Sequence, residues 1–256
     1  MDRLSINTFG VARFFMAICV FFCHVFEAFN NWGFLFVSVF FFMSGYGMEK
    51  SGKRKLALVR LVPYISFFAW YSAIYFFFFR VWIYPSSWFL VVYFVIMLLY
   101  RLIPNVYGLL AAFLALSVLL HGLGFEFGWC ASYGAFFFGL LVARHSWLFT
   151  LRNCLFFSVG FFLIVFRFEV ACWFLLPLFS WLVLSICSWN GFRYLALFGR
   201  YSFHFYCVHC LVLGLLGVTW TLGGSYEFWG VLLALLFSVF FSMFFKDYLF
   251  KYPVIK

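Results

Sequence analysis

Long apolar runs are the feature that most constrains this chain. They follow one another with only short polar breaks, and each extends over about 15 to 22 residues, the length that crosses the hydrocarbon core of a bilayer as a helix. Hydrophobic residues make up 68% of the chain and charged residues 9%, whereas soluble domains are near half apolar and about a quarter charged. The sequence therefore predicts an all-α polytopic integral membrane protein whose solvent is the lipid bilayer.

The runs predict about ten transmembrane helices in a single domain that covers residues 1–256. Their short connections predict antiparallel neighbours. The seventh run is short, so the seventh and eighth would alternatively form a hairpin that does not fully cross. The first run lacks a small-residue cleavage site, and we expect no cleavable signal peptide. The expected spans are 8–28, 32–49, 61–79, 86–103, 105–121, 129–143, 153–167, 169–188, 197–219 and 228–245.

The basic residues predict the orientation, because cytoplasmic loops carry an excess of Lys and Arg. With the N-terminus in the cytoplasm, ten spans leave only Arg80 and Arg167 in outer loops. Both termini are then cytoplasmic. The cytoplasmic side receives Arg3, Lys50, Lys53, Arg54, Lys55, Arg60, Arg101, Arg144, Arg152, Arg193, Arg200, Lys246, Lys251 and Lys256.

The net charge of +10 would suggest a nucleic-acid partner in a soluble protein, but loop charges that set orientation explain it here. We expect no nucleic-acid partner. The eight cysteines lie inside apolar runs and are predicted to be small core residues rather than disulfides. Cys207-Val-His-Cys210 resembles a metal motif, but it lies in a spanning segment with no second ligand pair. We therefore expect no metal.

Two ionisable residues inside the first span are the leading functional candidates. Arg13 and His24 are eleven residues apart, so they share one helix face and lie roughly 16 Å apart along the axis. Such residues are costly in a membrane and usually functional. Arg13 would otherwise snorkel to the interface, and His24 would otherwise be a structurally satisfied histidine. Glu27, one turn further on, would orient or charge-balance the imidazole.

Other candidates follow along the chain. Ser44-Gly45-Tyr46 ends the second span and would shape a site or simply allow close helix packing. Lys53, Arg54, Lys55 and Arg60 form a basic loop that sets topology, contacts lipid headgroups or docks a nucleotide-bearing cofactor. In the ninth span, Tyr206 and His209 are three residues apart and share a face.

These residues, in this order, resemble the membrane acyltransferase-3 family, which includes bacterial O-antigen and exopolysaccharide O-acetyltransferases. The likeness begins with Arg13-x10-His24 and Phe41-Phe42-Met43-Ser44-Gly45-Tyr46. It continues with Arg60-Leu-Val-Pro63 and with Trp88-Phe89-Leu90 at the start of the fourth span. It ends with Gly199-x-x-Ser202-Phe203-x-Phe205-Tyr206-x-x-His209.

The resemblance implies transfer of an acyl group, usually acetyl from acetyl-CoA, to a hydroxyl of a cell-surface glycan or lipid-linked saccharide at a bacterial inner membrane. It implies that His24 is the catalytic histidine and Arg13 its essential companion. Ser44, Gly45 and Tyr46 would shape the site, and Arg60 would lie on the cytoplasmic donor side. Many members carry an arginine three residues before Arg60, where this chain has Ala57.

In the expected mechanism, the phosphates of acyl-CoA are held by Arg60, the basic loop and Arg13. His24 would remove the proton of the acceptor hydroxyl, with Glu27 favouring the imidazolium. An acyl-imidazole intermediate is the other route. Two further hypotheses remain from the sequence: a transporter or flippase of a glycan precursor, and a non-catalytic partner in a glycan-assembly complex.

Overall fold

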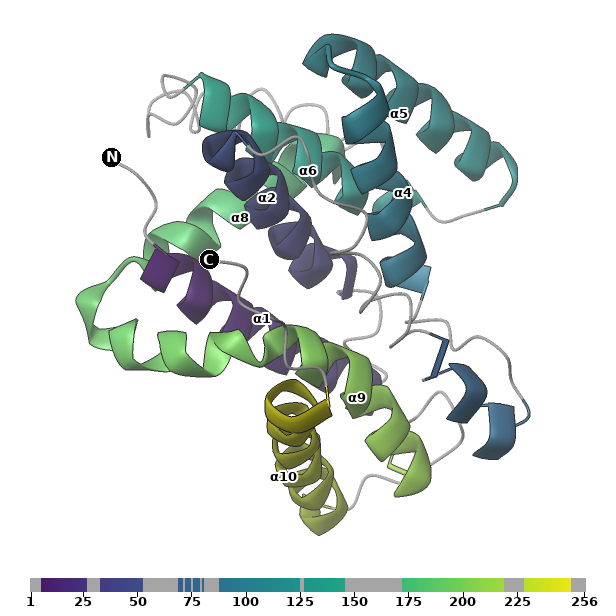
Figure 1. Cartoon of the computed structure of the whole chain (residues 1–256), viewed down its shortest axis with the longest axis vertical. Helices are drawn as coiled ribbons and strands as arrows, with labels where there is room; N and C mark the ends of the chain where they lie inside the picture. Colours follow the sequence, from purple (N-terminus) through teal and green to yellow (C-terminus); the bar gives the residue numbers. More distant parts are fainter. Residues whose placement is uncertain are drawn as a thin grey trace. The chain divides into compact units, whose positions relative to one another are not determined.

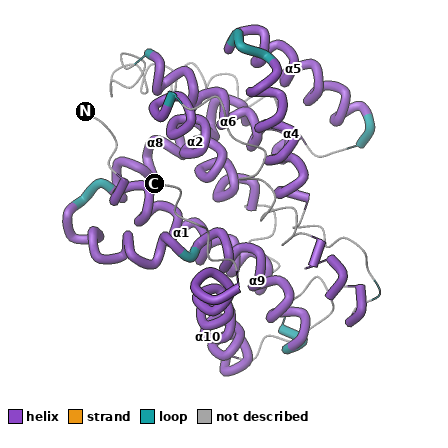
Figure 2. Tube along the Cα trace, viewed as in Figure 1, coloured by secondary structure: helices purple, strands orange, loops and turns teal. Residues whose placement is uncertain are grey.

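The computed structural model of the chain describes residues 6–26, 33–52, 69–70, 72–74, 76–78, 80, 88–124, 127–145, 172–218 and 228–249. The described residues form helices and turns, with no strand among them (Figure 2). The all-α prediction is therefore confirmed for this part of the chain. The helices shown in Figure 1 are α1 (Ile6–Val25), α2 (Gly33–Ser51), α4 (Trp88–Leu102), α5 (Val106–Gly122), α6 (Phe127–Arg144), α8 (Cys172–Cys187), α9 (Ser202–Leu215) and α10 (Phe228–Phe244).

Most of these helices lie within a few residues of an expected span. The expected span 61–79 is described only in short helical pieces, and the span 153–167 lies outside the described residues. Within the described ranges, two helical stretches are long and apolar enough to cross a bilayer, namely Asn7–Val25 and Phe228–Asp247. Gly134–Arg144 and Ser202–Leu215 are shorter apolar helical stretches.

The expected span 197–219 begins too early. Residues Asn190–Arg200 form a separate 3₁₀ helix, η6, and α9 begins only at Ser202. Most of the apolar residues of η6 lie between Arg193 and Arg200, and Leu197 and Phe198 are exposed. A hydropathy window joins this amphipathic segment to the following apolar run, which explains the error. After α10, the chain continues as a short π-helix, η8 (Phe245–Leu249).

The chain divides into two compact units. The first comprises residues 1–12, 34–55 and 92–196 and contains most of α2 and α4 with α5, α6 and α8. In this unit, α6 packs against α5 and α8. It also meets α2 closely, because a Cβ atom on Gly45 would overlap the carbonyl oxygen of Phe136, and one on Gly139 would overlap that of Phe42. Both glycines are therefore needed for the backbones of α2 and α6 to touch.

A polar cluster joins three helix ends in the first unit. Glu49, near the end of α2, accepts hydrogen bonds from Nε and Nη2 of Arg144 at the end of α6, at 2.9 and 2.7 Å. Tyr100, near the end of α4, donates its hydroxyl to the other Glu49 oxygen at 3.3 Å. The C-terminal ends of α2, α4 and α6 therefore lie on one side of this unit.

The second unit comprises residues 13–33, 56–91 and 197–256. It contains the C-terminal part of α1 with α9 and α10. Phe14 lies beside Phe198 (ring centroids 5.6 Å apart), and Phe21 beside Phe205 (6.0 Å), so α1 and α9 run parallel. Helix α10 packs against α9. Its continuation η8 returns to the start of α9, where Tyr201 donates a hydrogen bond to Asp247 at 3.2 Å, so α10 runs antiparallel to α9.

Candidate functional site

Two histidines from distant parts of the sequence meet in the second unit. His24 lies in the last turn of α1, His209 lies in the middle of α9, and their ring centroids are 5.3 Å apart. The parallel packing of the two helices brings the histidines to the same level, because Phe14 contacts Phe198 in η6 and Phe21, seven residues later, contacts Phe205 in α9, seven residues after Phe198. Both residues were candidates from the sequence, but the sequence did not predict that they lie side by side.

The ring of His209 is held in one orientation. The residue is fully buried, and its Nδ1 lies 3.0 Å from the carbonyl oxygen of Phe205. A carbonyl oxygen only accepts, so Nδ1 donates, and in the neutral ring Nε2 then carries the lone pair. Phe205 stacks on the imidazole (ring centroids 5.7 Å apart, interplanar angle 7°), while Tyr206 meets it edge-on at 5.6 Å.

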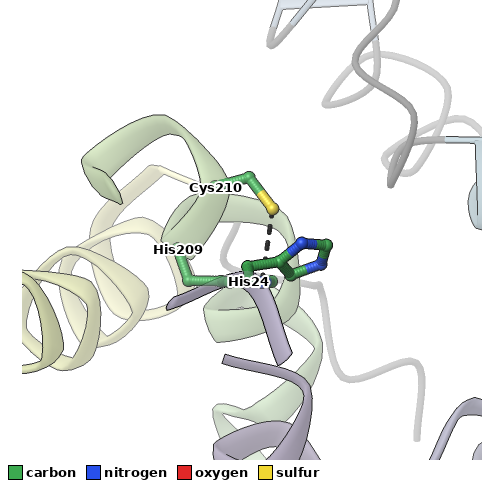
Figure 3. A group of neighbouring side chains, drawn as sticks. All are labelled: His24, His209 and Cys210. Carbon is green, nitrogen blue, oxygen red and sulfur yellow. Dashed lines mark hydrogen bonds between the residues drawn. The ribbon is translucent and has the colours of Figure 1, made fainter. Parts of the chain in front are cut away.

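Cys210 completes the cluster. Its Sγ lies 3.3 Å from Nε2 of His209, the distance of a thiol donating to the ring lone pair. Figure 3 shows the side chains of His24, His209 and Cys210 gathered between α1 and α9. One potential ligand atom from each residue lies within 4.8 Å of the other two. Cys207-Val-His-Cys210 lies in one helix, whereas the third donor of the cluster, His24, comes from another helix.

A small apolar hollow lies next to this cluster in the same unit. Phe205 links the two features, since it lines the hollow and also stacks on His209. The hollow is bounded by α1, α9 and α10, among others by Phe14, Ala17, Ser202, Val239 and Ser242. Such a cavity suits an apolar or weakly polar chain more than a charged group.

The other expected residues of α9 have local structural roles. Ser202 is the first residue of the helix, is buried, and donates its hydroxyl to the carbonyl oxygen of Gly199 at 2.9 Å. It also borders the hollow. Tyr206 is buried against His209. Tyr206 therefore belongs to the surroundings of His209, and Ser202 to the wall of the hollow.

Arg13 is exposed on α1, whereas His24 is partly exposed on the same helix. Ser44, Gly45 and Tyr46 belong to the first unit. There the Ser44 hydroxyl donates to the carbonyl oxygen of Phe40 at 2.8 Å, and Tyr46 packs edge-on against Phe9 at 5.5 Å. Gly45 makes the close contact with α6, so the packing role that the sequence left open is present at this residue.

The remaining candidates are not placed. Glu27 and the basic residues of the second loop lie outside the described residues, and so does Ala57. Those basic residues are Lys53, Arg54, Lys55 and Arg60. Trp88 begins α4, and its side chain lies outside the described part of the chain.

Comparison with known proteins adds no relative. No family model matches the chain, and neither a curated protein nor a solved structure matches it.

Proposed function

We propose that the chain is a multi-pass membrane acyltransferase that moves an acyl group, most simply acetyl, from acyl-CoA to a hydroxyl of a cell-surface glycan or lipid-linked saccharide. The observation that carries this proposal is the meeting of His24 with His209 at 5.3 Å. These two residues begin and end the series of motifs that resembles the acyltransferase-3 family. Ionisable residues that converge inside apolar helices are a functional site by default.

Ten membrane spans with both ends in the cytoplasm are part of the same proposal. Alternating spans would put the ends of α2, α4 and α6 on one side, which agrees with the cluster of Glu49, Tyr100 and Arg144. They would also put the start of α9 and the end of α10 on one side, in agreement with the bond between Tyr201 and Asp247. The proposed membrane is a bacterial inner membrane.

His24 would act as the general base in this reaction. A ring nitrogen of His24 takes the proton of the acceptor hydroxyl while the oxygen attacks the thioester carbonyl. The new carbon–oxygen bond forms, the carbon–sulfur bond breaks, and the departing CoA thiolate receives the proton from the imidazolium. His209, fixed by the carbonyl of Phe205, would position the ring of His24. An acyl-imidazole on His24 remains the alternative route.

The second unit offers separate places for the phosphates and for the pantetheine arm of acyl-CoA. The end near Arg13 and Arg200 carries exposed cations, which attract phosphate groups. The hollow beside Phe205 lies between these cations and the histidine pair along α9 and would take the pantetheine arm or the acyl chain. Arg60 and the 53–55 basic segment would add phosphate contacts on the cytoplasmic side.

The test uses purified full chain in nanodiscs with radiolabelled acetyl-CoA, and it measures both label transfer and acetyl-CoA hydrolysis. We expect His24→Ala to lose activity by about 10²- to 10⁴-fold, the usual contribution of a general base. His145→Ala is the matched control, because His145 follows the end of α6 in the other unit. The thermal unfolding curve of each variant shows that it is folded.

Wild-type activity in folded His24→Ala would overturn the assignment of the base. Folded wild-type protein that neither binds nor turns over acyl-CoA would contradict the enzyme proposal and favour a transporter or a non-catalytic partner. Flux of a lipid-linked saccharide across the vesicle membrane separates those two outcomes.

A further inference from the structure

The histidine pair has a third neighbour that the proposed acyl transfer does not use. Cys210 is buried, with 1% of its surface exposed, and its sulfur points toward Nε2 of His209 (Figure 3). Imidazole nitrogens and a thiolate sulfur are the donors that zinc prefers. In the described part of the chain, His24, His209 and Cys210 are the group of such residues whose donor atoms converge.

The distances suit a metal ion of zinc size. With zinc–nitrogen bonds of about 2.0–2.1 Å and a zinc–sulfur bond of about 2.3 Å, the donor atoms of a tetrahedral site lie about 3.3 to 3.6 Å apart. The sulfur of Cys210 and Nε2 of His209 are already 3.3 Å apart. All three donors lie within 4.8 Å, so the widest separation has to shorten by about 1 Å, which rotation of the His24 side chain can supply.

The surroundings of His209 are those of a metal ligand. Metal-binding histidines usually donate their second ring nitrogen to a carbonyl or carboxylate, which fixes the tautomer and the ring orientation. Nδ1 of His209 lies 3.0 Å from the Phe205 carbonyl, and the stacked ring of Phe205 restricts rotation. The lone pair of His209 Nε2 therefore points toward the sulfur of Cys210, with or without a bound ion.

We propose that His24, His209 and Cys210 form a three-ligand site for Zn²⁺, with the fourth position open. Three protein ligands and one exchangeable position are typical of catalytic rather than structural zinc sites. His209 and Cys210 are buried while His24 is partly exposed, so the accessible side of the cluster lies at His24. The fourth ligand would enter there.

Charge balance favours this assignment within an apolar environment. Zn²⁺ with one thiolate and two neutral imidazoles carries one net positive charge. A hydroxide or an acceptor alkoxide at the open position makes the site neutral, and a neutral group is far less costly to bury than a charged one. Zinc lowers the pKa of a bound water to about 7, so the neutral form is accessible under physiological conditions.

The metal site concerns the same residues as the proposed acyl transfer but does not depend on it. A nitrogen of His24 that binds zinc cannot also take a proton. In the loaded protein, the metal would bind the acceptor hydroxyl at its open position and lower its pKa, the proton would pass to the CoA thiolate that leaves when the carbon–sulfur bond breaks, and His24 would act by holding the ion. Loss of transfer in His24→Ala is expected in both cases, so metal binding has to be measured directly.

The experiment uses the full chain in nanodiscs, stripped with a chelator and dialysed against Zn²⁺ or Co²⁺. We expect about one ion per chain, as a three-ligand site requires. Bound Co²⁺ should give the visible bands of a tetrahedral ion and a near-ultraviolet thiolate-to-cobalt band. Cys210→Ser should abolish the thiolate band, and His24→Ala or His209→Ala should weaken Zn²⁺ affinity at least tenfold.

Cys207→Ser is the matched control, because Cys207 is also buried in α9 but is not part of the converging group. It should leave the stoichiometry and the thiolate band unchanged. If His209→Ala fails to fold, His24→Gln tests the same site from α1. Each variant is compared by its thermal unfolding curve.

Absence of bound Zn²⁺, or binding that none of the three substitutions weakens, would overturn the metal site. Acyl transfer that depends on His24 in metal-free protein would then still support the proposed function. Zinc binding that requires all three residues, without any acyl transfer, would instead support the metal site and contradict the proposed function.

Discussion

Glu49 and Arg144 form an ion pair with 2.7 Å between Oε1 and Nη2, and the pair ties the end of α2 to the end of α6. Glu49 is the last residue of one expected span and Arg144 directly follows another, and both spans should end at the cytoplasmic surface. Tyr100, from the end of a third such span, binds the same carboxylate at 3.3 Å. The meeting of the ends of α2, α4 and α6 in the first unit agrees with the direction of these helices that the basic loops predict.

Cysteine labelling in inverted and right-side-out vesicles tests this alternation. We expect Ser51→Cys and His145→Cys, at the ends of α2 and α6, to react with an impermeant maleimide from the cytoplasmic side. Arg80→Cys should react from the opposite side, because Arg80 lies in an outer loop of the ten-span topology. Labelling of positions 51 and 145 from different sides would contradict the topology.

The ion pair itself should contribute little stability. The Arg144 and Glu49 side chains are 32% and 17% exposed, and partly solvated pairs contribute about 1 kcal/mol or less. Glu49→Gln should therefore lower the free energy of unfolding by at most about 1 kcal/mol, with a smaller difference in high salt. Lys50→Gln, at the next residue, is the control. A charge-swapped variant, Glu49→Arg with Arg144→Glu, should recover most of the lost free energy of unfolding.

The glycine contact between α2 and α6 should be far more sensitive. Gly45→Ala and Gly139→Ala both place a methyl group against a facing backbone carbonyl, and overpacking of this kind costs about 1 to 3 kcal/mol or more. Gly47→Ala, two residues along α2, meets nothing within 4 Å and should be neutral or stabilising by up to about 1 kcal/mol. Unfolding in nanodiscs measures the difference. Equal effects at positions 45 and 47 would contradict the close contact.

Filling the hollow in the second unit should affect acyl-donor binding. Val239→Phe adds a ring to the wall of the hollow and should raise KM for acetyl-CoA, with a larger increase for longer acyl chains. Leu236→Phe is the control, because Leu236 is 56% exposed on the same helix. Steady-state kinetics with acetyl-, butyryl- and hexanoyl-CoA measure the effect. An unchanged KM in Val239→Phe would exclude the hollow as the donor pocket.

Hydropathy predicted most of the helices because apolar runs and polar breaks alternate clearly along this chain. It failed at residues 190–200, where Arg193 and Arg200 enclose apolar residues that belong to an amphipathic 3₁₀ helix. The three-residue period of a 3₁₀ helix and the 3.6-residue period of an α-helix are hard to distinguish over eleven positions. An apolar run also does not show which face of the helix is buried.

The candidate site could be predicted only one helix at a time. His24 and His209 were recognisable as ionisable residues in apolar helices, but the spacing within one helix says nothing about a partner in another. Cys210 was set aside because Cys207-Val-His-Cys210 has no second ligand pair within its own span. Its closeness to His24 becomes visible only when the parallel packing of α1 and α9 brings the two helices together.

The parallel pairing of α1 with α9 also determines when the site is assembled during synthesis. His24 and His209 are 185 positions apart in the chain, which corresponds to roughly 10 to 40 s of translation at about 5–20 residues per second. During that interval His24 has been synthesised and its partners have not. A nascent chain that stops before α9 therefore contains the first histidine without His209 or Cys210, so the cluster can be complete only after α9 has been made.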